Sequence, residues 1–254
     1  MAGGTARLGA ARLNAVEQVK AARATELVDE DGDPIELELA PGLSADEIDA
    51  LAADRGVTPP RELRQTLAHT AAIDGLLAGI DLTGQGGGAE AEEVFPSGWP
   101  IAEDGFGNHW LLDVTPADTD VAPVFFVCHD PPVVLFQSPS LAHFVQEILR
   151  MYVPPHESLV DDVHEDRPFN VWRTNPGLIS HSSALASEDA EVQTFAAELD
   201  ERFLIVDLRS PEIGMGFSWG RFGPRSELRR HGDRRLFAYA APPKKPGLLG
   251  RLFG

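Results

Sequence analysis

The most regular pattern of hydrophobic and polar positions lies between residues 99 and 137. Apolar and polar side chains alternate from His109 to Val114, and an unbroken apolar run from Pro123 to His129 is typical of a strand buried on both faces. Gly, Asn, Asp and Pro residues between these runs indicate turns. The pattern predicts a meander of four strands: Trp99 to Glu103, His109 to Val114, Pro123 to His129 and Val133 to Gln137.

The period then changes to that of a helix. Ser138 and Pro139 favour a helix start, and Pro154-Pro155 a helix end. Between them one apolar stripe is formed by Leu141, Phe144, Val145, Ile148, Leu149 and Tyr152. Upstream, residues 11–27 look helical, and Ser44 to Glu47 is a capping box that opens a helix ending at Gly56. A second helix follows Thr58-Pro59-Pro60.

After Pro155 the pattern predicts a separate, smaller α+β unit. We expect a polar loop over 155–166, a helix from Ser187 to about Arg202 and a buried strand from Phe203 to Leu208. Two further strands, expected to be antiparallel, are Gly216 to Phe222 and Arg235 to Ala240. The fold class is α+β, and the chain divides into an N-terminal helix and linker (1–36), a central domain (37–153), a C-terminal extension (154–243) and a basic, apolar tail (244–254).

The order of these pieces points to a family. Leu39 to Thr70 supplies two helices separated by Gly56 and a Pro-containing restart, and the turn Asp104-Gly105-Phe106-Gly107-Asn108 follows. A strand ending at Asp113, the strand PVFFVCHD and the closing helix complete the series. Over roughly residues 37–152 the chain resembles the SUKH superfamily, which includes fungal cell-wall-synthesis regulators of the Smi/Knr type and many bacterial immunity proteins. The resemblance implies a non-enzymatic protein-binding module, acting either as an immunity protein that neutralises a toxin or as a regulatory scaffold.

Charge narrows the choice of partner. The net charge is −19, with −26 on residues 1–220 and +7 on residues 221–254. An acidic body argues against nucleic-acid binding and suits a basic protein, such as a nuclease toxin, through long-range attraction. Solubility alone is the other interpretation of this charge. The chain has no apolar run of the roughly 18 residues that a transmembrane helix needs, no apolar signal-peptide core and a single cysteine, so we expect a cytoplasmic protein.

Candidate catalytic residues are few. Cys128 and His129 are neighbours on a strand and point to opposite faces, so a buried structural thiol is expected. His156 and His164, with Asp161, Asp162 and Glu165, match no zinc spacing and are interpreted as a solvated acidic loop. We expect Asp104 to stabilise its turn and Asp113 to lie at a strand end, not to form a pair of catalytic carboxylates. No catalytic residue, metal or cofactor is predicted, and an enzyme would require a deep pocket with convergent polar groups.

The arginines between Arg221 and Arg235 are interleaved with Trp219, Phe222 and Phe237. This mixture suits phosphate or single-stranded nucleic acid, or an intramolecular match with the acidic body, which we favour. A regulatory scaffold would use this region or the tail for docking. The residues expected to be exposed near turns and to contact a partner are Asp74, Asp81, Asp104, Asn108, His109, Trp219 and Arg221.

Overall fold

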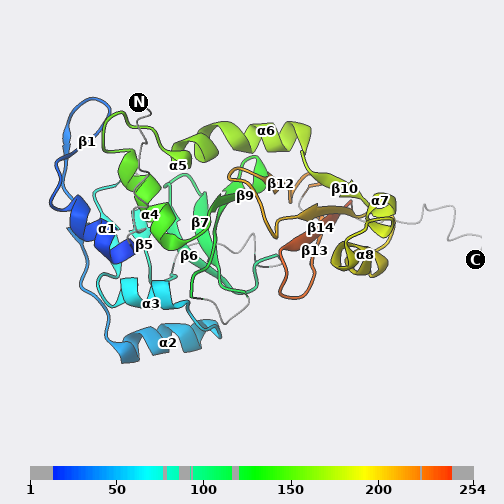
Figure 1. Ribbon diagram of the computed structural model, residues 1–254, viewed down its shortest axis with the longest axis horizontal. Helices are drawn as coiled ribbons and strands as arrows, with labels where there is room; N and C mark the ends of the chain where they lie inside the picture. The colour runs from blue at the N-terminus through cyan, green and yellow to red at the C-terminus, as the bar shows by residue number, and fades with distance from the viewer. Residues whose placement is uncertain are drawn as a thin grey trace, which may run out of the picture.

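The computed structural model describes residues 14–76, 79–85, 92, 94–115, 120–223 and 225–241. It confirms the α+β class: an eight-stranded sheet, a four-stranded sheet and a two-stranded hairpin, all with antiparallel pairing between neighbours. Figure 1 shows the N-terminal helices on one side of the molecule, the large sheet in the middle and the four-stranded sheet, with two short helices labelled α7 (His181–Leu185) and α8 (Ala190–Ala197), on the other side.

The predicted four-stranded meander is confirmed as the centre of the large sheet. In spatial order the strands are β12 (Gly216–Phe217), β9 (Pro132–Ser138), β8 (Val124–His129), β7 (His109–Asp113), β6 (Gly98–Glu103), β5 (Gly79–Asp81), β4 (Ala72–Asp74) and β3 (Glu38–Leu39). Alternate residues of the meander face opposite layers. Trp110, Leu112 and Phe126 enter one core, whereas Leu111 and Phe125 enter another.

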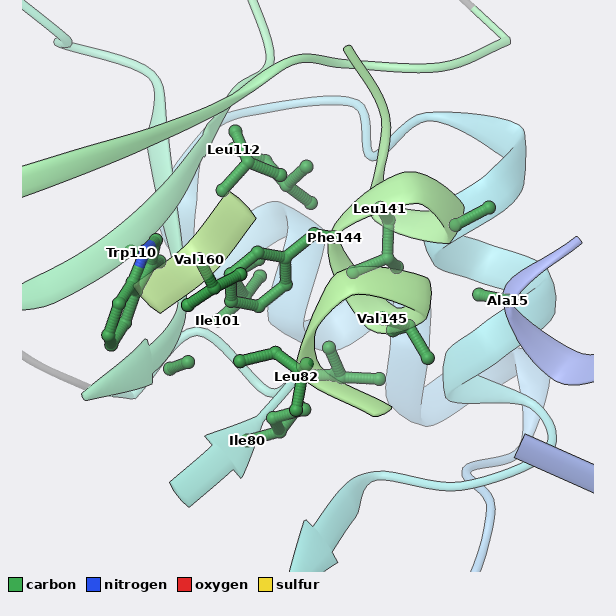
Figure 2. Packing of buried hydrophobic residues seen from close by; sticks show 14 of the residues in the cluster. Ala15, Ile80, Leu82, Ile101, Trp110, Leu112, Leu141, Phe144, Val145 and Val160 are labelled. Atoms are coloured by element: carbon green, nitrogen blue, oxygen red, sulfur yellow. The ribbon is translucent and has the colours of Figure 1, made fainter. Parts of the chain in front are cut away.

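The first of these cores lies between the meander and four helices, of which three precede the meander in the sequence and one follows it. The helices are α1 (Ala15–Ala22), α2 (Ala45–Arg55), α3 (Arg61–Leu67) and α4 (Leu141–Arg150). Figure 2 shows Phe144 and Val145 of α4 among Leu82, Ile101 and Trp110, and all five are buried. Together these contacts position α4 across the meander.

The helix ends follow local chemistry. Ser44 and Glu47 form the predicted capping box, and Gly56 ends α2 with φ +66°. The predicted start of α4 is wrong by two residues, because Ser138 is still hydrogen-bonded within β9 and Ser140 accepts from the amide of His143 instead. In α1 the described helix is shorter than the predicted span of 11–27, of which residues 11–13 lie outside the described residues.

The C-terminal unit differs more from expectation. Its elements are α5 (Leu159–Asp161), a π-helix (Asp162–Asp166), α6 (Arg167–Thr174), β10 (Leu178–Ser180), α7 (His181–Leu185), α8 (Ala190–Ala197), β11 (Leu204–Asp207), β13 (Glu227–Arg230) and β14 (Leu236–Ala240). The predicted loop over 155–166 is wrong, because Val160 and Val163 are buried and Ser158 caps a helical turn. The predicted helix 187–202 is also too long: Asp189 caps α8 at its amides, and the helix ends at Ala197.

The two predicted C-terminal strands are not partners of each other. The first shrinks to β12, which pairs with β9 of the large sheet because Gly216 lets the two backbones approach closely at Val134. The second is β14, which pairs with β11 and with β13, a strand that the sequence pattern did not predict. The large sheet therefore receives one strand from the C-terminal unit.

A buried ion cluster joins the two sheets. The Asp113 carboxylate at the end of β7 is 0% exposed and accepts hydrogen bonds from both terminal nitrogens of Arg230, each at 3.0 Å, and from Nε of Arg235 at 2.9 Å. The Arg230 guanidinium also lies over the rings of Phe95 and Phe237. For these two arginines the favoured intramolecular match between basic cluster and acidic body is confirmed.

Candidate functional site

An open pocket of about 590 Å³ brings several acidic side chains together on a concave surface. It is lined by Asp29, Glu30, Asp31, Ile35, Gly75, Leu76, Met151, Tyr152, His156, Asp161 and Glu165, and we call it the acidic pocket. Among these lining residues are five carboxylates and an apolar floor, but no lysine or arginine. The pocket therefore combines apolar surface with unbalanced negative charge.

The first wall of the acidic pocket is the hairpin of β1 (Leu27–Val28) and β2 (Pro34–Ile35). Its turn is closed by the Asp29 carboxylate, which accepts from the amides of Asp31 at 3.0 Å and Asp33 at 2.8 Å. The Val28 amide donates to the Tyr152 carbonyl at 3.0 Å. This bond ties the hairpin to the chain that follows α4, so that the two sides of the pocket are held together.

The opposite wall is the segment between α4 and α6. Ser158 Oγ donates to the Glu147 carbonyl, and the Glu147 carboxylate accepts from the Leu159 amide at 2.9 Å. These bonds fix α5 and the π-helix against the end of α4. A π-helical turn often marks a functional site, and here it presents Glu165 to the pocket.

The crowding of negative charge in the acidic pocket affects the pKa of Asp161. Partial burial raises the pKa of this carboxyl, and the neighbouring carboxylates of Glu165 and Glu30 raise it further, although His164 opposes the shift. The raised pKa means that the folded chain disfavours the charge on Asp161. A cation placed in the pocket would relieve that repulsion.

A second feature is the loop Asp104 to Asn108 between β6 and β7. The Asp104 carboxylate accepts from the amides of Phe106 and Asn108, from Asn108 Nδ2 at 2.6 Å and from His164 Nε2 at 2.9 Å. Burial alone would raise the pKa of Asp104, but these hydrogen bonds outweigh it and lower the pKa. Asn108 in turn accepts from the His129 amide at 3.1 Å. The loop is therefore rigidly braced.

The braced loop presents one apolar side chain. Phe106 is 78% exposed, between Gly105 and Gly107, both of which have positive φ. His164 links this loop to the acidic pocket, because it binds Asp104 and precedes Glu165 in the π-helix. The loop that carries Phe106 is thus linked through the π-helix to one wall of the acidic pocket.

Among the seven residues predicted to contact a partner, two of the acidic ones are exposed as expected, whereas Asp104 and His109 are not. Asp74 and Asp81 are exposed in the short strands β4 and β5. The expectation that Asp104 and His109 are exposed is wrong, since the Asp104 side chain is 6% exposed and His109 is 4% exposed. Burial follows from their roles, as Asp104 braces the loop from within and His109 lies in the central strand β7.

The remaining three predicted residues lie partly or fully at the surface. Asn108 is half-buried at the end of the loop that carries Phe106. Trp219 is half-buried and Arg221 is exposed, and neither lines the acidic pocket. Arg221 donates a hydrogen bond to the Trp172 carbonyl in α6. The structure does not bring the seven residues together in one site, and sequence reasoning missed Phe106 and the pocket carboxylates as a group.

The candidate nucleophile has the chemistry of a structural residue. Cys128 is 3% exposed, and burial raises the pKa of its thiol to about 11, so the thiol is protonated at neutral pH. Within the described part of the chain, no group of three or more His, Cys, Asp or Glu side chains is placed to hold a metal ion. Nor is any helix in that part long and apolar enough to cross a membrane.

The sheets and helices place the protein in the α+β class, and its net charge is strongly negative. A family comparison is more specific. Residues 42–147 match the SMI1 / KNR4 family (SUKH-1). The resemblance to the SUKH superfamily is thereby confirmed over a segment that runs from before α2 into α4. No curated protein and no solved structure matches the chain. The carboxylates of the acidic pocket all lie outside the matched segment, on either side of it in the sequence.

Proposed function

We propose that this protein is a non-enzymatic binding module whose partner is a basic protein. The acidic pocket is the observation that carries the proposal, since its lining combines five carboxylates with apolar side chains and contains no lysine or arginine. Protein interfaces combine an apolar centre with charged residues that select the partner. A lysine or arginine side chain of a partner would bury its alkyl stem on the floor and place its charge among the carboxylates.

The partner that suits this surface best is a toxin with a cationic active site, such as a nuclease. Such a toxin presents lysines and arginines to nucleic-acid phosphates, and an acidic protein can occupy the same groups. The net charge of −19 would steer the encounter over long range and make it sensitive to salt. The SUKH family includes immunity proteins, so we propose that the chain neutralises a toxin by direct binding, in the cytoplasm.

The alternative is a regulatory scaffold that docks through its C-terminal region. Arg221 and Trp219 favour it, because one is exposed and the other is half-buried on the C-terminal unit, away from the acidic-pocket lining. The tail 244–254 belongs to the same hypothesis and lies outside the described residues. Loss of partner binding on deletion of residues 244–254, with unchanged thermal unfolding, would favour this alternative.

The test is a pull-down from the native cell with three versions of the full chain. One is the wild type. The second neutralises the acidic pocket with Glu30→Gln, Asp161→Asn and Glu165→Gln. The third is a matched control with the same change in net charge at exposed positions elsewhere: Asp46→Asn, Glu188→Gln and Glu201→Gln. Each is washed at low and at high salt, and the eluted proteins are identified by mass spectrometry.

We expect one basic protein that binds the wild type and the control, leaves at high salt and is lost from the pocket variant. Co-expression of that protein with the wild type should then restore growth that the protein alone inhibits. Retention by the pocket variant as strong as by the wild type would contradict the proposed site. A partner that binds but has no toxic activity would favour the scaffold.

A further inference from the structure

A surface of opposite character lies on the C-terminal unit. Its members are aromatic and arginine side chains of α6 and of the turn after β12, and we call it the Arg–aromatic patch: Phe169, Trp172, Arg173 and Arg221. Phe169 is 51% exposed, which is unusual for phenylalanine in a packed protein. None of the four lines the acidic pocket on which the proposed function rests.

The patch is continuous because of helix geometry and one hydrogen bond. Phe169, Trp172 and Arg173 are spaced i, i+3 and i+4 along α6, so they share one face, while Val171 is buried. The Arg173 guanidinium lies 5.9 Å from the Phe169 ring centroid. Arg221 reaches the same helix, donating to the Trp172 carbonyl with its guanidinium 5.9 Å from the Trp172 ring centroid.

The charge of the patch is positive and unpaired. The patch contains two arginines and no acidic residue, in a chain whose net charge is −19. None of the ion pairs among the described residues involves Arg173 or Arg221. The cations of the patch are therefore available to an outside carboxylate.

We infer that the Arg–aromatic patch docks an acidic segment of a second protein, one that carries Asp or Glu next to an apolar side chain. Arginine and aromatic residues dominate the energetics of protein interfaces, and guanidinium groups bind carboxylates in a bidentate manner. Charge complementarity selects an acidic occupant. A short acidic segment brings only a few charges near the acidic body, whereas a nucleic-acid strand would bring one for each nucleotide. The inference goes beyond the proposed function, which rests on the acidic pocket.

The experiment selects displayed random 12-residue peptides on the full-length protein and measures the enriched peptides by fluorescence anisotropy. The variant is Phe169→Ala with Arg173→Glu, both exposed, and neither side chain makes the Arg221 bond to the Trp172 carbonyl. The matched control is Leu185→Ala with Arg23→Glu, an exposed apolar residue and an exposed arginine elsewhere. Thermal unfolding of each variant verifies the fold, and Arg173→Glu alone is the second variant if the pair unfolds.

We expect enriched peptides that combine Asp or Glu with apolar residues. Their affinity should fall by about tenfold or more in the patch variant and by less than about twofold in the control. Peptides without carboxylates, peptides that bind the patch variant equally well, or no enrichment at all would overturn the inference. Tighter binding of a twelve-nucleotide oligo-dT than of any enriched peptide, lost in the same variant, would assign the patch to single-stranded nucleic acid instead.

Discussion

At the candidate site, some residues stabilise the loop Asp104 to Asn108, and another is placed to contact a partner. The polar groups of Asp104 and Asn108 form hydrogen bonds within the loop and with His164 and His129. Phe106 is held outward, 78% exposed, with its backbone fixed on both sides. A loop backbone that is ordered before binding loses little entropy on binding. Phe106 is therefore suited to be an anchor of the interface.

Replacing Phe106 by alanine should separate binding from stability. Because the ring is exposed, the free energy of unfolding should change by no more than about 0.5 kcal/mol. Affinity for the basic partner should fall about tenfold or more, as expected of an aromatic anchor. Isothermal titration calorimetry with the purified partner measures the second quantity and denaturant unfolding the first. Unchanged affinity would remove Phe106 from the interface.

Asp161 gives a prediction that depends on pH. The folded chain raises the pKa of this carboxyl above its ordinary value of 3.8, mainly by burial and then through Glu165 and Glu30. A raised carboxyl pKa means that folding disfavours the ionised form, so Asp161 reduces stability above its folded pKa and has no such effect well below 3.8. Asp161→Asn should therefore stabilise the protein at pH 7, by about 0.2–0.5 kcal/mol for repulsion from Glu165 four residues along.

The same substitution should weaken binding of the basic partner, because it removes a pocket carboxylate. Denaturant midpoints at pH 7 and pH 3 measure the stability effect, with Glu201→Gln as the control, because Glu201 is exposed and does not line the pocket. A gain at pH 7 that persists at pH 3 would show that charge is not its cause. Stabilisation coupled to lost binding is the expected pattern for a residue kept for function.

Elements of secondary structure were predictable where a single periodicity decides them. The strands β6 to β9 alternate between two buried layers, and their order along the chain is also their order in the sheet. The extension was predicted less well, because tertiary contacts decide its elements. β12 is two residues long and exists through its pairing with β9, and no local pattern indicates such a partner.

Gly216 is the residue on which that pairing depends. A Cβ at this position would collide with the Val134 carbonyl and with the Leu135 side chain, so Gly216→Ala should force β12 away from β9. We expect a loss of about 1–3 kcal/mol, typical of overpacking in a close-packed interior. The control is Gly79→Ala in β5, where a Cβ meets no atom within 4 Å. Chemical denaturation of both variants decides, and equal stability would contradict the close approach.

At the scale of the whole molecule, the acidic body and the C-terminal unit are joined around Asp113. Its buried carboxylate pairs with Arg230, whose side chain is 4% exposed, and with Arg235, whose side chain is 24% exposed, whereas the exposed arginines of the Arg–aromatic patch form a separate feature. Phenylalanines of both sheets pack around the same place. The protein therefore has two surfaces of opposite charge, the acidic pocket and the Arg–aromatic patch.

Removing Asp113 should therefore destabilise the molecule strongly. Asp113→Ala leaves two arginines without their carboxylate, Arg230 being 4% exposed, and the expected cost is about 3–5 kcal/mol. The exposed pair Arg61–Asp120, with both side chains 67% exposed, is the control, and Asp120→Ala should cost less than about 1 kcal/mol. Thermal and denaturant unfolding measure both. Similar small losses would show that the two units do not depend on this cluster.

The sequence indicated the acidic character of the body but not the site. Asp29, Glu30 and Asp31 precede the meander by some 70 residues, and Asp161 and Glu165 follow it. Only the packing of the β1–β2 hairpin on the end of α4 brings them together, through the Val28 amide and the Tyr152 carbonyl. Phe106 lies within the predicted turn, but the turn pattern favours the polar residues around it as contacts. Its exposure follows from the bracing bonds of Asp104, which a turn pattern does not reveal.

The most direct test of the acidic pocket as the binding site is amide hydrogen exchange of the complex with the captured partner. Binding at this surface should slow exchange over residues 29–36, 104–108 and 159–166, all of which belong to the acidic pocket or the loop that carries Phe106. The pocket variant, mixed with the same partner, should show no such protection. Protection confined to other segments, with these three unchanged, would contradict the assignment of the acidic pocket as the partner-binding site.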